Sequence, residues 1–334
     1  RWYGVRLWLN GRTFAEPLPS RRTAFPFGLS LRRPALDALL LETARSAPNV
    51  QVRERCTVQR LLIAGGRVRG VALSPDHGAG ELRAELVLIA GGRHSRLVRG
   101  AGTRTYALPN RHTAYVAYVA GIPFEERPSL EGYYWHGRSA SLLPADGGLR
   151  VAGVMAPPGS WPAGSWSDRL LGELRRYAPL RARLARARVV SPPVAVRGLR
   201  NVWRESTTPG LLLLGDAAVQ TDPLFGQGIS WALRGGEWAA NDVLARLGEH
   251  TGERRSISLQ QVRSRTFVHR FLGMSAFSTV PPGSMVERLL IAGAAASPKS
   301  TALVLRLILG FATVSREQAP RRSLATWLRE ALAG

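Results

Sequence analysis

An acid stands directly at the end of a predicted buried strand, ahead of a glycine-rich helix start, in residues 211–228. Four leucines at 211–214 predict a short buried strand, a Gly-Asp pair ends it, and a Gly-x-Gly opens an amphipathic helix over 229–247. Ligands of α/β proteins bind at such crossings, because the helix N-terminus offers unpaired N–H groups and a partial positive charge. Glycine lets a flat or charged ligand approach the backbone closely. The candidate binding residues of this segment are Gly215, Asp216, Pro223, Gly226, Gln227 and Gly228.

The elements expected before this crossing alternate between helix and strand. Asn10-Gly11 predicts a hairpin turn, and residues 30–47 predict a helix with Pro34 in its first turn. The apolar stripe of this helix comprises Leu36, Leu39, Leu40 and Ala44. Short strands are expected at 50–52, 56–63, 67–73 and 82–90, the middle two joined as a hairpin. This order predicts an α/β domain with an inserted antiparallel piece.

Residues from about 105 to 204 carry a different pattern. Alternating apolar and polar residues at 113–119, 139–143 and 149–154 predict an antiparallel sheet, and residues 166–177 predict a helix. The aromatic side chains of this region either belong to the core of the sheet, which is the commoner role, or line an apolar pocket. They are Tyr133, Tyr134, Trp135, Trp161 and Trp166.

The net charge of +23 suggests a nucleic-acid binder, but the distribution of charge argues against it. All basic residues except Lys299 are arginine, and they are spread along the chain, which indicates a coding bias. We expect no nucleic-acid partner. The single Cys56 allows no internal disulfide and fits a reducing cytoplasm, and the six histidines show no metal-ligand spacing. Residues 301–314 are apolar but too short to span a bilayer, so we expect a core helix, with a peripheral membrane contact as the alternative.

The combination Gly215-Asp216, Asp222-Pro223 and Gly-x-Gly before a helix resembles the second flavin-binding signature of one flavoprotein family. This family comprises FAD-dependent monooxygenases of the p-hydroxybenzoate hydroxylase type and related geranylgeranyl reductase-like and halogenase-like flavoproteins. The resemblance implies FAD as cofactor, with the Asp216 carboxylate accepting hydrogen bonds from the ribityl chain. It also implies that the 223–228 loop lies beside the isoalloxazine ring, where the helix N-terminus stabilises the anionic reduced flavin. A helix-capping Asp at a strand end is the alternative.

Two segments carry weaker parts of the same resemblance. Residues 30–40 resemble a Ser-x-x-Arg-x-x-Leu segment whose Arg contacts the cofactor; Arg33 is the match and Arg32 the fallback. A cation at a helix N-terminus opposes the helix dipole, so Arg33 needs an anionic or polar partner, and a solvated surface charge is the alternative. Cys56-Thr57-Val58 resembles the strand that lies over adenine, where Val58 binds through its backbone; a core valine is the alternative.

The segment 90–96 resembles the middle signature of the family, with Gly92, Arg93 and Ser95 as matches. Gly91 or Ile89 stands where the family has an acid, which argues against direct reduction by a nicotinamide, although NAD(P)H stays a candidate electron donor. The Gly-x-Gly-x-x-Gly fingerprint that holds the pyrophosphate is missing. We expect a fragment whose first βαβ unit precedes Arg1 and which binds FAD weakly, if at all. The alternative is a lineage that lost this unit.

The resemblance implies an α/β fold with three parts: an FAD-binding Rossmann-like domain without its first βαβ unit, an inserted antiparallel β-sheet substrate domain, and a helical C-terminus. The expected FAD-binding segments are residues 1–104 and 209–248. The substrate domain is expected at 105–208, and the helical C-terminal region at 249–334.

We predict an FAD-dependent monooxygenase that oxidises a small apolar or aromatic substrate through a C4a-(hydro)peroxyflavin, as the resemblance implies. No side chain is singled out as a catalytic acid or base. One alternative is a flavin-dependent reductase or dehydrogenase of an apolar, isoprenoid-like substrate, and another is a non-catalytic remnant without flavin. The Trp-x-Trp-x-Ile-Pro pattern of flavin halogenases is absent, which argues against halogenation.

Overall fold

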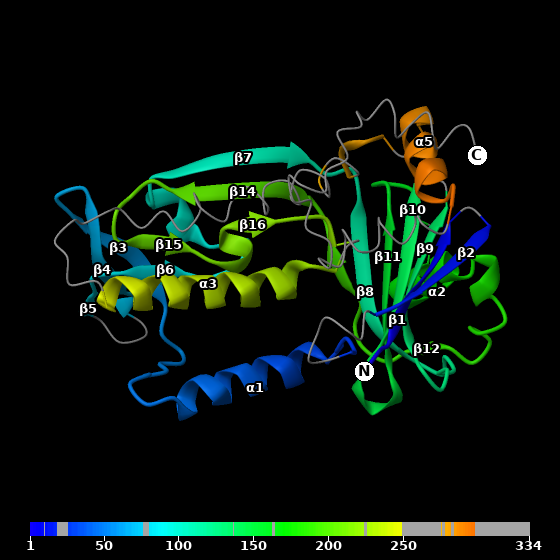
Figure 1. The fold of residues 1–334 in the computed structure, drawn as a ribbon, viewed down its shortest axis with the longest axis horizontal. Coiled ribbons are helices and arrows are strands. Elements are labelled where there is room, and N and C mark those ends of the chain that lie inside the picture. Colours follow the sequence, from blue (N-terminus) through cyan, green and yellow to red (C-terminus); the bar gives the residue numbers. More distant parts are fainter. Residues whose placement is uncertain are drawn as a thin grey trace. The chain divides into compact units, whose positions relative to one another are not determined.

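The computed structural model describes residues 1–9, 11–18, 26–75, 80–135, 137–161, 164–223, 226–248, 275, 278–281 and 284–297. The chain divides into two compact units (Figure 1). Unit 1 comprises residues 1–43, 110–199 and 276–334, and unit 2 comprises residues 44–109 and 200–275. The predicted helix at 301–314 lies outside the described residues.

Unit 1 is built on a mainly antiparallel sheet, whose strand order in the described part is β12-β8-β11-β10-β9-β1-β2, with β13 also paired to β8. The only parallel pair in this order joins β1 to β9. The strands are β1 (Gly4–Leu9), β2 (Arg12–Pro17), β8 (Thr113–Ala120), β9 (Ser129–Trp135), β10 (Arg138–Pro144), β11 (Arg150–Ala156), β12 (Arg188–Val189) and β13 (Val194–Val196). The antiparallel sheet predicted for this region is confirmed.

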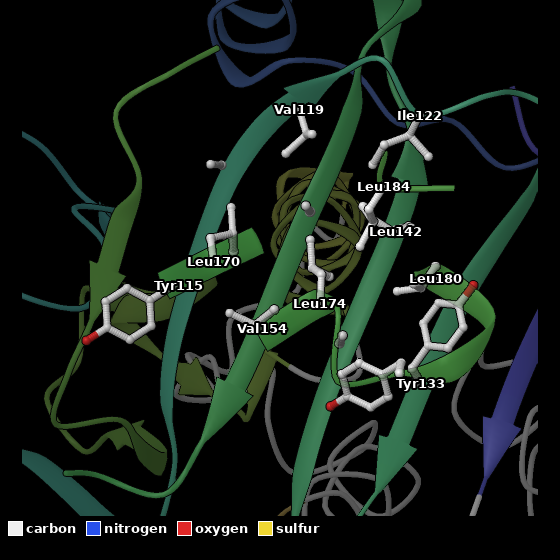
Figure 2. Close-up of a cluster of buried hydrophobic side chains, with 14 residues drawn as sticks. Tyr115, Val119, Ile122, Tyr133, Leu142, Val154, Leu170, Leu174, Leu180 and Leu184 are labelled. Carbon is white, nitrogen blue, oxygen red and sulfur yellow. The ribbon is translucent and has the colours of Figure 1, made fainter. Parts of the chain in front are cut away.

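One face of this sheet packs against the helix α2 (Trp166–Leu174) and the short helix η4 (Ala178–Leu180). Alternation in β8 directs Tyr115, Ala117 and Val119 to this face, as the period of a strand requires. Figure 2 shows these strand residues together with leucines of α2 in one buried cluster. Ser165 caps α2 by accepting a hydrogen bond from the Asp168 amide at 3.1 Å, which fixes where the helix begins.

At the N-terminus the two compact units divide the chain differently from the expected domains. Residues 1–104 were assigned to the FAD-binding part, but residues 1–43 cluster with unit 1, because β1 pairs with β9 and adds the β1–β2 hairpin to the large sheet. The second segment of unit 1 covers 110–199, close to the expected 105–208. It is shorter at both ends because β7 and β14, which flank it, pair with each other inside unit 2. Of the expected helical region, α5 (Met285–Ala294) is described and clusters with unit 1.

Unit 2 contains three small sheets in its described part. β3 (Val58–Ala64), β4 (Arg67–Leu73) and β5 (Gly80–Arg83) form an antiparallel meander, and the predicted hairpin at 56–73 is confirmed. β7 (Thr103–Pro109), β14 (Arg200–Ser206) and β16 (Val219–Gln220) form a second sheet. β6 (Val87–Ile89) and β15 (Leu211–Leu213) pair in parallel. The remaining elements are α3 (Gly228–Gly248) and the short helices η2 (Arg96–Gly100) and η5 (Gly215–Ala217).

Two strand predictions in unit 2 were wrong. The strand expected at 82–90 is two strands, because the amide of Ala84 still bonds to Arg69 of β4, whereas that of Val87 bonds to Gly210 beside β15. The intervening bend moves the chain from one sheet to the other. Residues 50–52 form no strand: Asn49 and Arg55 both have positive φ, and these turns leave no extended segment to pair.

The helices begin and end close to the predicted positions, but the apolar stripe of one is not buried. α1 (Arg33–Ser46) and α3 match the predictions for 30–47 and 229–247. However, α1 has no buried residue, and Leu39 of its apolar stripe is 59% exposed. Among the described helices, none combines the length and the apolar character needed to cross a membrane.

Candidate functional site

The candidate site begins where two parallel strands end at the same edge of a sheet. β15 and β6 pair in register from Leu211 opposite Val87 to Leu213 opposite Ile89, and the amide of Leu214 continues the ladder by donating to Ile89 at 2.9 Å. Two glycine-containing turns therefore follow neighbouring strand ends, one at 215–216 and one at 91–92. Ligands of open α/β sheets bind at the carboxyl ends of such strands.

The Gly215–Ala217 turn requires its glycine. Gly215 has φ of +55°, a conformation that costs an L-residue about 1–2 kcal/mol. A Cβ at this position would also lie 3.4 Å from the Cβ of Ala232 on α3. Gly215 therefore lets the strand turn and lets α3 approach it closely.

Asp216 is exposed. Within the part of the chain that the structure describes, its carboxylate has no hydrogen-bond or ion-pair partner. A Cβ placed on Gly228, the first residue of α3, would lie 4.0 Å from Oδ1 of Asp216. The acid thus stands beside a helix N-terminus, whose partial positive charge stabilises an anion. No described bond shows Asp216 capping α3, so its carboxylate is available to a ligand.

A backbone hydrogen bond closes the turn that precedes α3. The Gly226 amide donates to the Pro223 carbonyl at 2.9 Å, and Gly226 has φ of +60°. The Gln227 carbonyl accepts the amide of Trp231 at 2.9 Å, which begins the α3 ladder. Asp222, next to Pro223, is fully buried, unlike the exposed Asp216.

Six of the eight predicted binding residues thus lie together in unit 2: Gly215, Asp216, Pro223, Gly226, Gln227 and Gly228. Val58 also belongs to unit 2, as the half-buried first residue of β3 opposite Leu73. Arg33 belongs to unit 1. The part played by each in binding a cofactor stays a prediction.

Arg33, the first residue of α1, has the anionic partner that its position requires. Its Nε and Nη2 donate to Oδ1 and Oδ2 of Asp37, each at 3.0 Å, and both side chains are more than half exposed. The backbone amide of Arg33 donates to the Tyr118 hydroxyl at 3.0 Å. Arg32, the fallback, is bound to Asp146 through its backbone amide at 2.9 Å and its Nε at 2.7 Å. These contacts fix the start of α1 on unit 1.

The turn at 91–95 explains why an acid is difficult to place there. Gly92 has φ of +74°, and its carbonyl accepts the amide of Ser95 at 3.2 Å. A Cβ on Gly91 would lie 3.2 Å from Oγ and 3.3 Å from Cβ of Ser95, which is crowded for any side chain. The glycine at 91 is therefore consistent with the local packing of this turn.

The aromatic residues considered for a pocket divide between core and surface. Tyr133 is buried in the core of unit 1, and Tyr115 contacts Trp161 and Trp166 at ring-centroid distances of 4.2 and 5.0 Å. Tyr134 is also buried, with its hydroxyl donating to Glu287 of α5. Trp135 is 39% exposed. Packing against neighbouring rings explains most of them, as the commoner role predicted.

Two functional candidates were missed by sequence reasoning because their partners are distant along the chain. Arg204 of β14 donates from Nη1 to the Ala217 carbonyl at 3.1 Å, and Gln220 donates from Nε2 to the Asp216 carbonyl at 2.9 Å. Burial lowers the pKa of the Arg204 guanidinium from its ordinary value. No local motif marks either residue, since their role depends on how β14 and β16 pair beside the turn.

A buried ionic cluster in unit 1 was also missed. Glu131 is 2% exposed and accepts hydrogen bonds from Arg150 at 3.1 Å, from Arg183 at 2.8 and 2.5 Å, and from the Tyr133 hydroxyl. Burial opposes ionisation of Glu131, but the hydrogen bonds and charges of this cluster outweigh it and hold its pKa below the ordinary value. Burial and the neighbouring carboxylate raise the pKa of Tyr133. Every acceptor here is used internally, so the cluster is structural.

Comparison with known proteins supports the predicted resemblance. The chain is 29% identical over 229 residues to digeranylgeranylglycerophospholipid reductase of Methanothrix thermoacetophila, which covers 65% of this chain and 55% of the relative. It therefore spans about half the length of that curated relative. The fold matches the flavin-dependent brominase Bmp2, with a TM-score of 0.72 and 16% identity over 99% of this chain and 81% of the brominase. No protein-family model matches the sequence.

A second solved structure has the same fold. It is p-nitrophenol 4-monooxygenase PnpA of Pseudomonas putida, with a TM-score of 0.67 and 19% identity over 93% of this chain and 80% of that one. The chain therefore has the fold of FAD-dependent oxidoreductases and is similar in sequence to a reductase. The predicted fold class, a Rossmann-like part with an antiparallel sheet domain, is confirmed. The brominase match covers nearly the whole chain, so both units have counterparts in that structure.

Proposed function

We propose that this protein binds FAD at the 215–228 segment and acts as an oxidoreductase. The observation that carries the proposal is the Asp216 carboxylate, which is exposed, without a partner in the described residues, and beside the first residue of α3. A carboxylate in this position accepts hydrogen bonds from hydroxyls such as those of the ribityl chain. The N-terminus of α3 offers N–H groups to the ring end of the same ligand.

We propose a reductase of an apolar, isoprenoid-like substrate as the finer function. The sequence relative at 29% identity is named as a reductase of a geranylgeranyl lipid, whereas the monooxygenase and the brominase share the fold at less than 20% identity. Bound reduced FAD would supply a hydride for this reaction, and a proton from solvent would complete the conversion of a carbon–carbon double bond to a single bond. The single free cysteine, Cys56, suits a reducing compartment such as the cytoplasm.

The monooxygenase predicted from the sequence is the second candidate, since the fold similarity to p-nitrophenol 4-monooxygenase favours it. It would take a small apolar or aromatic substrate, with O₂ as co-substrate and NAD(P)H or another donor supplying electrons. Glycine at position 91, where the hydroxylases have an acid, favours another donor.

Product mass separates the two candidates. The chain is supplied with saturating FAD, reduced chemically, and incubated with geranylgeraniol or with a phenol, with and without O₂. A reductase gives a product heavier by about 2 mass units per double bond without O₂, and a monooxygenase gives one heavier by about 16 only with O₂. No product from either substrate, together with no FAD binding, would support the non-catalytic alternative.

A further inference from the structure

The backbone of the Gly215–Ala217 turn is held by the side chains of Arg204 and Gln220. The Asp216 carbonyl accepts Nε2 of Gln220 at 2.9 Å and Nη1 of Arg204 at 3.5 Å, and the Ala217 carbonyl accepts the same Arg204 nitrogen at 3.1 Å. A charged donor forms a stronger hydrogen bond than a neutral one, so Arg204 is the principal contact. The guanidinium thus bridges two successive carbonyl groups of the turn.

Arg204 is itself fixed to the segment that it holds. Its backbone amide donates to the Ala218 carbonyl at 2.8 Å, and the Ala218 amide donates to the Gly215 carbonyl at 2.9 Å. Carbonyl oxygens of four successive residues, 215–218, therefore have donors within unit 2. These carbonyl groups are therefore satisfied within unit 2, whereas the exposed Asp216 carboxylate has no partner among the described residues.

We propose that Arg204 and Gln220 are positioning residues that set the Asp216 carboxylate for its ligand. The proposal rests on the proposed function, in which this ligand is the flavin. A carboxylate that binds neighbouring hydroxyls must be held within about 0.5 Å and 10–20° of its binding geometry. A three-residue turn that begins at a glycine cannot hold itself that firmly. The bridge from β14 and the amide of Gln220 supply this rigidity without touching the ligand.

The test compares substitutions at these residues with a matched control on the same strand. Arg204→Ala removes the bridge, Arg204→Lys keeps the charge and one donor, and Gln220→Ala removes the second contact. Arg200→Ala is the control, because Arg200 lies at the other end of β14 and is exposed. We expect Arg204→Ala to weaken FAD binding about tenfold, or about 1.4 kcal/mol, with Arg204→Lys restoring part of it and Arg200→Ala unchanged.

Two further readouts separate positioning from general stability. At saturating FAD, the visible circular dichroism of the bound flavin should change in Arg204→Ala, while the unfolding midpoint stays close to that of Arg200→Ala. Amide exchange measured without flavin should rise in residues 214–220 of Arg204→Ala and, to a smaller extent, of Gln220→Ala, but not of Arg200→Ala. Wild-type affinity and flavin dichroism in Arg204→Ala would overturn the proposal while leaving FAD binding intact. If the wild-type chain binds no FAD, the proposed function fails. Unchanged amide exchange at 214–220 in Arg204→Ala would then also overturn the proposal that Arg204 holds the turn.

Discussion

Replacing Glu131 with Gln should destabilise the protein strongly, since the carboxylate is the shared acceptor of a buried cluster. Arg150 is 1% exposed and Arg183 25% exposed, so a neutral amide leaves one buried and one partly hydrated guanidinium without their counter-charge. Removing one partner of a buried ion pair costs about 3–5 kcal/mol. In the variant, water can hydrate the Arg183 guanidinium, and Arg150 keeps its hydrogen bond to the Pro123 carbonyl at 2.6 Å. We therefore expect a loss of about 3 kcal/mol in the free energy of unfolding.

Equilibrium unfolding in urea at pH 7 measures this loss, with Glu125→Gln as the matched control. Glu125 pairs with Arg6 at the surface, where both side chains are more than a third exposed, and such a pair contributes about 0–1 kcal/mol. A loss in Glu131→Gln no larger than that in Glu125→Gln would refute the reasoning. The pH dependence gives a second check. The folded pKa of Glu131 is lowered, so its contribution is complete above its unfolded pKa of about 4.3 and disappears as pH falls through the folded value. The difference between wild type and Glu131→Gln should therefore narrow below about pH 4.3.

Two other substitutions test local geometry. Gly215→Ala should lower the free energy of unfolding by about 1–2 kcal/mol, because φ is +55° there. Gly235→Ala inside α3, where an added Cβ meets open space, should raise it by about 0.5–1 kcal/mol. Equal losses of stability in both variants, measured by urea unfolding, would contradict this. Asp146→Ala should speed amide exchange over residues 31–36, because Asp146 accepts both the amide and Nε of Arg32. Unchanged exchange there would show that Asp146 does not fix the start of α1.

The part of the site built from neighbouring residues was predictable from the sequence. Four leucines predicted the buried strand β15, and the glycines on either side of Asp216 predicted a turn and the start of α3. These signals are local: a strand needs burial, and a left-handed turn needs glycine. For the same reason α1 and the β3–β4 hairpin were predicted close to their true bounds.

What the sequence could not show depends on pairing between distant segments. The β1–β2 hairpin joins the large sheet because β1 lies parallel to β9, more than a hundred residues later, and no local pattern specifies that partner. Arg204 contacts Ala217 only because β14 pairs with β16, and Glu131 meets Arg183 across fifty-two positions. One arginine among many carries no mark of such a role.

Titration of the chain with FAD is the measurement that tests the central claim most directly, with Asp216→Ala and Glu237→Ala compared under the same conditions. Glu237 is an exposed acid of α3 that pairs only with Arg234 among the described residues, at 2.7 Å. We expect saturable though weak binding by the wild type and by Glu237→Ala. Loss of hydrogen bonds to a charged acceptor costs about 1.5–3 kcal/mol, so Asp216→Ala should bind at least about tenfold more weakly. Equal affinity in Asp216→Ala, or no binding by the wild type below about 1 mM FAD, would contradict a flavin site at 215–228.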